Sequence, residues 1–164
     1  MKDRRKTVSR VVLWALVVLW MGVIFWFSAE KAQDSDQTSG RVIRWLLSHF
    51  DSEFLSLSPE EQLLMIGDWS HVVSKLAHFC LFGMLGCLSF AAFSVDLPLR
   101  RAFPAALGLC VVRAVLDEVH QSFTPGRSCE VRDMAIDAAG AALGILFLFL
   151  LFSLVNRKKR STTK

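Results

Sequence analysis

A long apolar run near the start of the chain is the feature that most constrains its fold. Residues Val11–Phe27 include no charged side chain. A helix rises about 1.5 Å per residue and the hydrocarbon core of a bilayer is about 30 Å thick, so this run crosses most of a membrane as a single helix. A signal peptide would have a shorter apolar region and a clearer cleavage site than Ser28-Ala29. We therefore expect the segment to be retained.

The rest of the chain extends this interpretation, because 53% of its residues are hydrophobic. A soluble helical bundle would need polar residues at every third or fourth position of its helices, and the long apolar runs lack them. The sequence predicts an all-α integral membrane bundle with about four transmembrane helices. The predicted spans are residues 11–28, 75–95, 102–122 and 133–155. The third span is polar in its second half, so we expect that half to face the other helices.

The segment from 29 to 74 is polar and acidic, and is predicted to be an external loop. Apolar residues recur at helical spacing between Val42 and Phe50. The sequence Ser58-Pro59-Glu60-Glu61 is typical of a helix start, with Pro at the first helical position. Both patterns favour two short amphipathic helices lying at the membrane surface.

Basic residues predict the orientation of the chain. They gather in the N-terminal segment 1–10, in the pair Arg100-Arg101 and in the tail 156–164. Cytoplasmic segments of membrane proteins are enriched in Lys and Arg, so we expect both termini of the membrane domain 11–155 to be cytoplasmic. The protein is thus predicted to be a multi-pass protein of the cell membrane. Beside such apolar runs, the basic ends favour membrane anchoring over nucleic-acid binding.

With this topology, many polar side chains of the spans fall at the outer face of the bundle. Ionisable groups in a span are costly unless they are paired or hydrated, so they mark either polar contacts between helices or a functional site. For Arg113 and Asp117, four residues apart on one helix face, we favour a structural pair. The remaining candidates for a site are Ser28, Lys75, His78, Glu118, Gln121, Arg127, Asp133 and Asp137.

The segment Thr124–Ser128 has the composition of a turn that presents Arg127. Proline fixes φ, glycine permits a positive φ, and backbone N–H groups of such turns form concave anion-binding surfaces. Arginine binds phosphate and carboxylate in a bidentate manner, and Lys75 would add a second positive charge. Pairing of Arg127 with Asp133 or Glu118 inside the protein is the alternative.

Metal binding and catalysis are less well supported by the sequence. Glu118 and His120 point about 200° apart on a helix, and no HExxH or CxxC motif occurs, so we expect no metal site. The scattered cysteines give no disulfide framework. General acid–base chemistry by Glu118 with His78 is possible in principle, because desolvation raises the pKa of a carboxyl group. A nucleophile such as Ser128 or Cys129 lacks a supporting motif.

Three stretches of the sequence, FWFSAE, SKLAHFCLFGMLG and DEVHQSFTPGRSCEVRDMAIDAAGAALG, resemble the VanZ-like family. The resemblance extends from about Trp14 to about Phe149. It implies a small multi-helix membrane protein without an established cofactor, from a family named for a member associated with low-level resistance to teicoplanin. The pattern residues are Ser28, Lys75, His78, Glu118, Gln121, Pro125, Arg127, Asp133 and Gly140. Asp137 stands where the family is expected to have Asn, which adds a titratable group.

Three functions remain open from the sequence. The leading hypothesis is a protein that binds an anionic lipid or lipid-linked wall precursor at the outer face through Arg127 and Lys75, with an effect on glycopeptide susceptibility. A second is a membrane-embedded hydrolase or transferase that uses Glu118 as acid or base. A third is a structural accessory subunit, which would depend on packing glycines. These glycines are Gly83, Gly86, Gly140 and Gly144. Partners other than membrane lipids, and the oligomeric state, are not predicted by the sequence.

Overall fold

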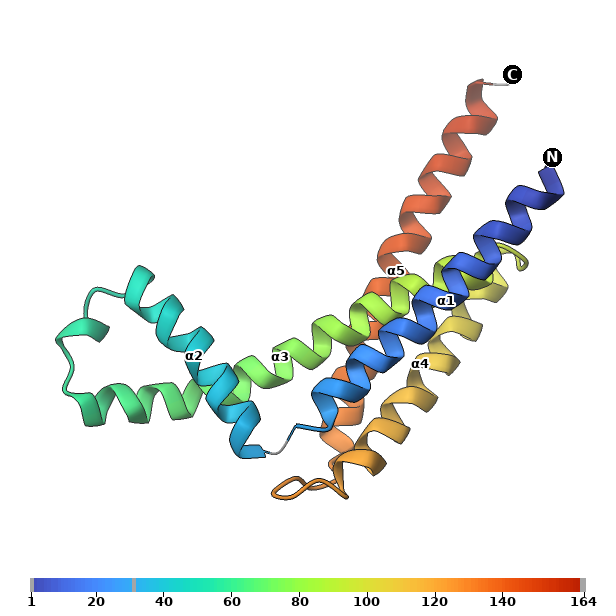
Figure 1. The fold of residues 1–164 in the computed structure, drawn as a ribbon. Coiled ribbons are helices and arrows are strands. Elements are labelled where there is room, and N and C mark those ends of the chain that lie inside the picture. Colours follow the sequence, from blue (N-terminus) through green and yellow to red (C-terminus); the bar gives the residue numbers. More distant parts are fainter. Residues whose placement is uncertain (1, 31, 163–164) are drawn as a thin grey trace.

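The structure, a computed structural model, describes residues 2–30 and 32–162. Within them it is entirely helical and has no strand. The elements are α1 (Lys2–Ser28), α2 (Ala32–Phe50), the 3-10 helix η1 (Phe54–Ser56), α3 (Pro59–Ser94), α4 (Leu99–Gln121) and α5 (Val131–Thr162). Helix α3 is central, because it contacts α1, α2, α4 and α5. Figure 1 shows a bundle of α1, α4, α5 and the C-terminal half of α3, from which α2 and the start of α3 project as a hairpin.

Three helices are long and apolar enough to cross a membrane. They are Asp3–Ser28, Pro59–Ser94 and Val131–Asn156. Large apolar side chains on their outer faces are exposed, including Val18 at 66% and Trp26 at 73%. Such an apolar outer surface is stable only when lipid covers it. The protein is therefore a membrane protein, and the predicted all-helical class is confirmed.

The segment predicted to be external differs from the prediction in one respect. Helix α2 forms as a separate helix, but the second expected amphipathic helix is the continuous beginning of α3. The predicted start is present: Ser58 caps α3 in a capping box, its hydroxyl accepting from the Glu61 backbone N–H at 3.3 Å while the Glu61 carboxylate accepts from the Ser58 N–H at 2.8 Å. No proline follows Pro59 until Pro98, so nothing breaks the helix before the predicted span begins.

A small apolar cluster joins the two arms of the hairpin. Ile43 of α2, Phe54 of η1 and Ile66 of α3 are buried against one another. At about 1.5 Å per residue the 36 residues of α3 extend about 54 Å, which is more than the hydrocarbon thickness. The N-terminal part of α3 thus lies beyond the bundle, where α2 covers one of its faces.

Helices α3 and α5 approach closely at glycines. A Cβ atom on Gly140 would collide with the backbone carbonyl of Phe79, and one on Gly144 would collide with the carbonyl of Gly83. The Cys87 thiol donates a hydrogen bond to the Gly144 carbonyl at 3.3 Å. Small residues allow such close backbone contact between membrane helices. The contact fixes the two helices that carry much of the polar cluster described below.

The end of the bundle nearer the chain termini is held by ion pairs between α1 and the α3–α4 turn. Arg10 Nε donates to Asp96 Oδ2 at 2.7 Å, and Lys6 lies 3.6 Å from Asp96 Oδ1. The hydrogen bond from Arg10 holds the pKa of Asp96 below its usual value. Both chain termini lie toward this end (Figure 1). The backbone of the predicted basic tail is helical to Thr162, and its side chains from position 157 onward lie outside the described residues.

Candidate functional site

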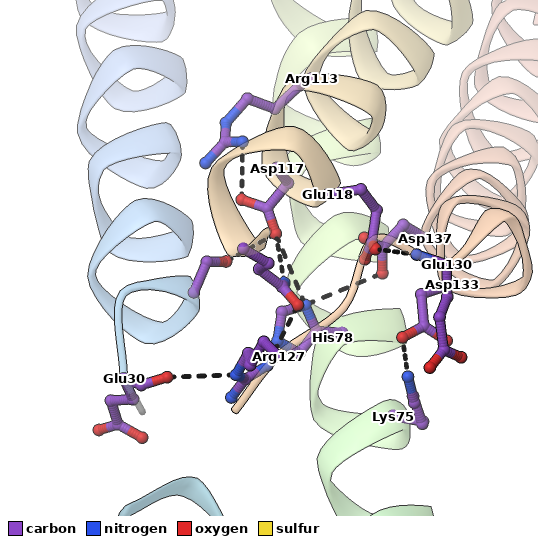
Figure 2. A network of polar contacts seen from close by, with 12 residues as sticks. Glu30, Lys75, His78, Arg113, Asp117, Glu118, Arg127, Glu130, Asp133 and Asp137 are labelled. Carbon is purple, nitrogen blue, oxygen red and sulfur yellow. Dashed lines mark hydrogen bonds and ion pairs between the residues drawn. The ribbon is translucent and has the colours of Figure 1, made fainter. Parts of the chain in front are cut away.

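Polar side chains from four helices meet at the end of the bundle away from the termini. Figure 2 shows this network, to which α3 contributes Lys75 and His78 and α5 contributes Asp133 and Asp137. Helix α4 contributes Asp117, Glu118 and Gln121, α1 contributes Ser28, and the α4–α5 loop contributes Arg127. The network lies at the end of the candidate span of α1, at the start of that of α5 and near the middle of that of α3.

Asp117 is the most highly connected side chain of the network. It is completely buried. Its Oδ2 atom accepts hydrogen bonds from Ser28 Oγ at 2.6 Å and from Gln121 Nε2 at 3.0 Å. Its Oδ1 atom accepts from an Arg113 guanidinium nitrogen at 2.7 Å. These bonds tie α1 to α4, because donors to a buried carboxylate offset the loss of its hydration.

The α4–α5 loop presents Arg127 through a tight turn. The Arg127 N–H donates to the Thr124 carbonyl at 3.1 Å, and Gly126 has φ of 82°. A positive φ at this position is typical of a type II turn, with Pro125 at the position that favours proline. The guanidinium donates to the Glu30 backbone carbonyl and to Gln121 Oε1, each at 3.2 Å. Both acceptors are neutral, and within the described residues no carboxylate pairs with Arg127.

Lys75 and Glu118, which were also predicted to belong to the site, already have partners. Lys75 forms an ion pair with Asp133, and both side chains are largely buried. Glu118 is 1% exposed, and its Oε2 atom accepts a hydrogen bond from the Glu130 backbone N–H at 2.9 Å. Glu118 therefore anchors the loop at the point where α5 begins.

His78 lies between two carboxylates without a hydrogen bond to either. Its Nδ1 atom is 4.0 Å from Asp117 Oδ2 and 4.0 Å from Asp137 Oδ1. Asp137 is 1% exposed, and no described protein group hydrogen-bonds to its Oδ2 atom. His120 points elsewhere, because its ring stacks on Phe25 of α1 with centroids 4.4 Å apart.

A small cavity of about 20 Å³ lies within the network. Seven of the eight residues proposed from the sequence line it, and Ser28 lies behind it on Asp117. A cavity of this size holds about one water molecule. The residues that line it are Ser74, Lys75, His78, Glu118, Gln121, Arg127, Asp133, Ile136 and Asp137.

Sequence reasoning missed the central position of Asp117. The pairing with Arg113 that favoured a structural role is present, but it occupies only one carboxylate oxygen. The spacing of Asp117 and Gln121, four residues apart on one helix face, was the available signal for a larger network. The contribution of the Glu30 and Glu130 backbone carried no sequence signal, because any residue type supplies those groups.

A family model described as VanZ/LLP1 matches residues 13–153. The chain belongs to the VanZ/LLP1 family. This confirms the resemblance drawn from the three sequence stretches, and the matched region includes every residue of the network from Ser28 to Asp137. No significant match was found among curated proteins or among solved structures. Together with its apolar helices, membership makes this a VanZ-like membrane protein.

Proposed function

We propose that this VanZ-family protein binds an anionic group, phosphate or carboxylate, at the outer face of the membrane. The group would be carried by an envelope lipid or a lipid-linked wall precursor. The proposal rests on the environment of Arg127. Its guanidinium is half-buried beside the cavity and donates hydrogen bonds to two neutral acceptors. A guanidinium held in this way keeps its full charge and has donors in a planar arrangement suited to an oxyanion.

The proposed position of the polar network at the outer face requires four membrane spans. Helix α4 would be the fourth, because its 23 residues are long enough to cross the hydrocarbon core. Two of its charged residues, Arg113 and Asp117, pair with each other. One face buries Ala106, Cys110 and Ala114, while Val112 and Leu116 are exposed and would face lipid. With four spans both termini would lie on the same side of the membrane, and their Lys and Arg residues favour the cytoplasmic side, which would leave the polar network outside.

The dimensions of the cavity define how the ligand would bind. A phosphate group is larger than the space for one water molecule, so the anion would bind at the opening beside Arg127. Lys75 would contribute by shifting part of its contact from Asp133 to the ligand, and Gln121, Glu118 and His78 would orient it. A protein that sequesters or shields a wall precursor in this way would change teicoplanin susceptibility by changing access to that precursor.

Native mass spectrometry tests the proposal. Detergent-purified wild type and Arg127→Ala are incubated with envelope lipid extract, and both bound and released masses are followed. We expect an unmodified anionic lipid bound to the wild type and lost from the variant. Arg127→Lys should bind more weakly than wild type, because lysine cannot make two parallel hydrogen bonds to one oxyanion.

Arg132→Ala is the matched control. Arg132 is exposed at the start of α5, near the network but outside its hydrogen bonds, so its removal should leave lipid binding unchanged. Thermal unfolding of each variant separates loss of binding from loss of fold. A chemically altered lipid would identify an enzyme, for which Glu118→Gln should abolish turnover but spare binding. Equal lipid retention by wild type and Arg127→Ala would refute the anion site and favour a structural role.

A further inference from the structure

His78, Asp117 and Asp137 are brought together from three different helices. Each offers one ligand atom, and these three atoms lie within 4.8 Å of one another. The two distances from His78 Nδ1 to the carboxylates, both 4.0 Å, are too long for hydrogen bonds. Two atoms that share a cation at about 2.1 Å each lie at most about 4.2 Å apart. The two distances from His78 fall within that limit, and a cation between the three atoms would draw them closer together.

Asp137 gives the independent reason to expect a ligand here. Its carboxylate is 1% exposed, lines the cavity, and has one oxygen, Oδ2, that no described protein group contacts by a hydrogen bond. Buried carboxylate oxygens in proteins are almost always satisfied by a donor or a cation.

The balance of charges inside the bundle also indicates a bound cation. Asp117 pairs with Arg113, Asp133 pairs with Lys75, and Arg127 is held by neutral acceptors. Glu118 receives a backbone N–H. Four carboxylates therefore face three cationic side chains, and the nearest basic group to Asp137 is His78, whose Nδ1 atom is 4.0 Å from Asp137 Oδ1.

From this geometry we infer that His78, Asp117 and Asp137 form a binding site for one divalent transition-metal cation of the zinc or manganese class. One imidazole nitrogen with two carboxylate oxygens is a mixed donor set that suits these ions, whereas calcium and magnesium prefer oxygen ligands alone. The adjacent cavity of about 20 Å³ leaves room for a water molecule in an open coordination position.

The surroundings of Asp117 resemble the outer shell of a metal site. Ser28, Gln121 and Arg113 all donate to its carboxylate and so fix its orientation, which is how outer-shell groups hold metal ligands. Because Ser28 and Gln121 both contact Oδ2, cation binding would displace one of these bonds. Gln121 keeps Arg127 as a partner in that case. The site shares His78 and the cavity with the proposed anion site, but cation binding does not require a bound anion.

Zinc is the probe for a direct test. Chelator-treated protein without a histidine tag, carrying Cys80→Ser and Cys129→Ser to remove the exposed thiols, is titrated with Zn²⁺ by calorimetry, and metal content is measured after desalting. We expect one zinc per chain and an upward shift of the unfolding temperature on zinc addition. His78→Gln and Asp137→Asn should each weaken zinc binding by more than about tenfold.

The matched controls are His49→Gln and Asp68→Asn, which change an exposed histidine and an exposed aspartate outside the cluster and should bind zinc like the parent. Asp137→Asn should fold at least as well as the parent in chelator, because it removes a buried negative charge whose Oδ2 atom has no hydrogen-bond donor. Absence of stoichiometric zinc, or equal binding by parent and Asp137→Asn, would overturn the assignment. Since the titration contains no lipid, its outcome is separate from that of the anion test.

Discussion

At the scale of single residues, Asp117 explains how a carboxylate is tolerated deep among apolar helices. Its two oxygens receive three donors, from Ser28, Arg113 and Gln121, of which only the first lies on another helix. The cost of burying the charge is thus offset locally by α4 itself, and the remaining bond fixes the end of α1. The same residue is therefore both an anchor and a member of the polar network.

Asp117→Asn is expected to destabilise the metal-free protein. The substitution leaves Arg113 buried without a counter-charge and turns one accepting oxygen into a donor group that faces other donors. Breaking a buried ion pair in this way costs about 3 kcal/mol in free energy of unfolding. Unfolding in mixed detergent, followed by tryptophan fluorescence, measures the loss. The same change at the exposed Asp68 should have no measurable effect, and comparable losses at both positions would contradict the assigned role.

Much of the network could be predicted from the sequence at this scale, because ionisable residues in apolar runs are few. Lys75, His78, Glu118, Arg127 and Asp137 were expected at one end, and they do line one cavity. Their pairings could not be predicted. Lys75 pairs with Asp133, whereas Arg127 is held by neutral acceptors. These choices depend on the relative rotation of the helices, which sequence periodicity does not determine.

At the scale of helices, the α3–α5 contact depends on the missing side chains of glycines. Gly140→Ala would place a methyl group against the Phe79 backbone carbonyl, which cannot move without shifting α3. We expect a loss of about 2 kcal/mol in free energy of unfolding, because overpacking forces the backbones apart. The measurement is the same unfolding assay.

Gly108→Ala is the control for that experiment. Gly108 lies on α4 with nothing within 4 Å of its added Cβ, so the methyl group meets open space. Its effect should range from neutral to about 1 kcal/mol of stabilisation, since alanine is the better helix former. If Gly140→Ala were as well tolerated as Gly108→Ala, close helix approach would not limit stability.

Helix boundaries were predictable to the extent that local signals mark them. Ser58 and Pro59 predicted the start of α3, where Ser58 and Glu61 form a capping box. The apolar runs predicted the positions of α1 and α5. The continuity of α3 through Lys75 had no positive signal. A change from amphipathic to apolar composition suggested a break between two helices, but only a residue that disrupts the backbone hydrogen-bond ladder would make one.

At the scale of the whole molecule, the proposed orientation can be tested with a native thiol. Cys129 is exposed in the α4–α5 loop, which the proposal places outside. A membrane-impermeant maleimide should label it in intact cells. A cysteine introduced at Thr7, near the start of α1, should react only after permeabilisation.

Cys129→Ser identifies the labelled position, because it should abolish the signal from intact cells. Cys80 is also exposed in the protein, but it lies within the apolar part of α3, where lipid would exclude a charged reagent. Labelling of Cys129 only after permeabilisation would reverse the assigned sidedness and place the polar network in the cytoplasm.

The uninterrupted length of α3 has a mechanical consequence. Clamped at its far half by glycine contacts and joined at its near half to α2, the helix is a stiff rod of about 54 Å with Lys75 and His78 close to its midpoint. A force on the projecting hairpin, from a change in bilayer thickness or from a molecule pressing on Trp69, would be transmitted along this rod to Lys75 and His78. The close contact between Phe79 and Gly140 of α5 would resist it there.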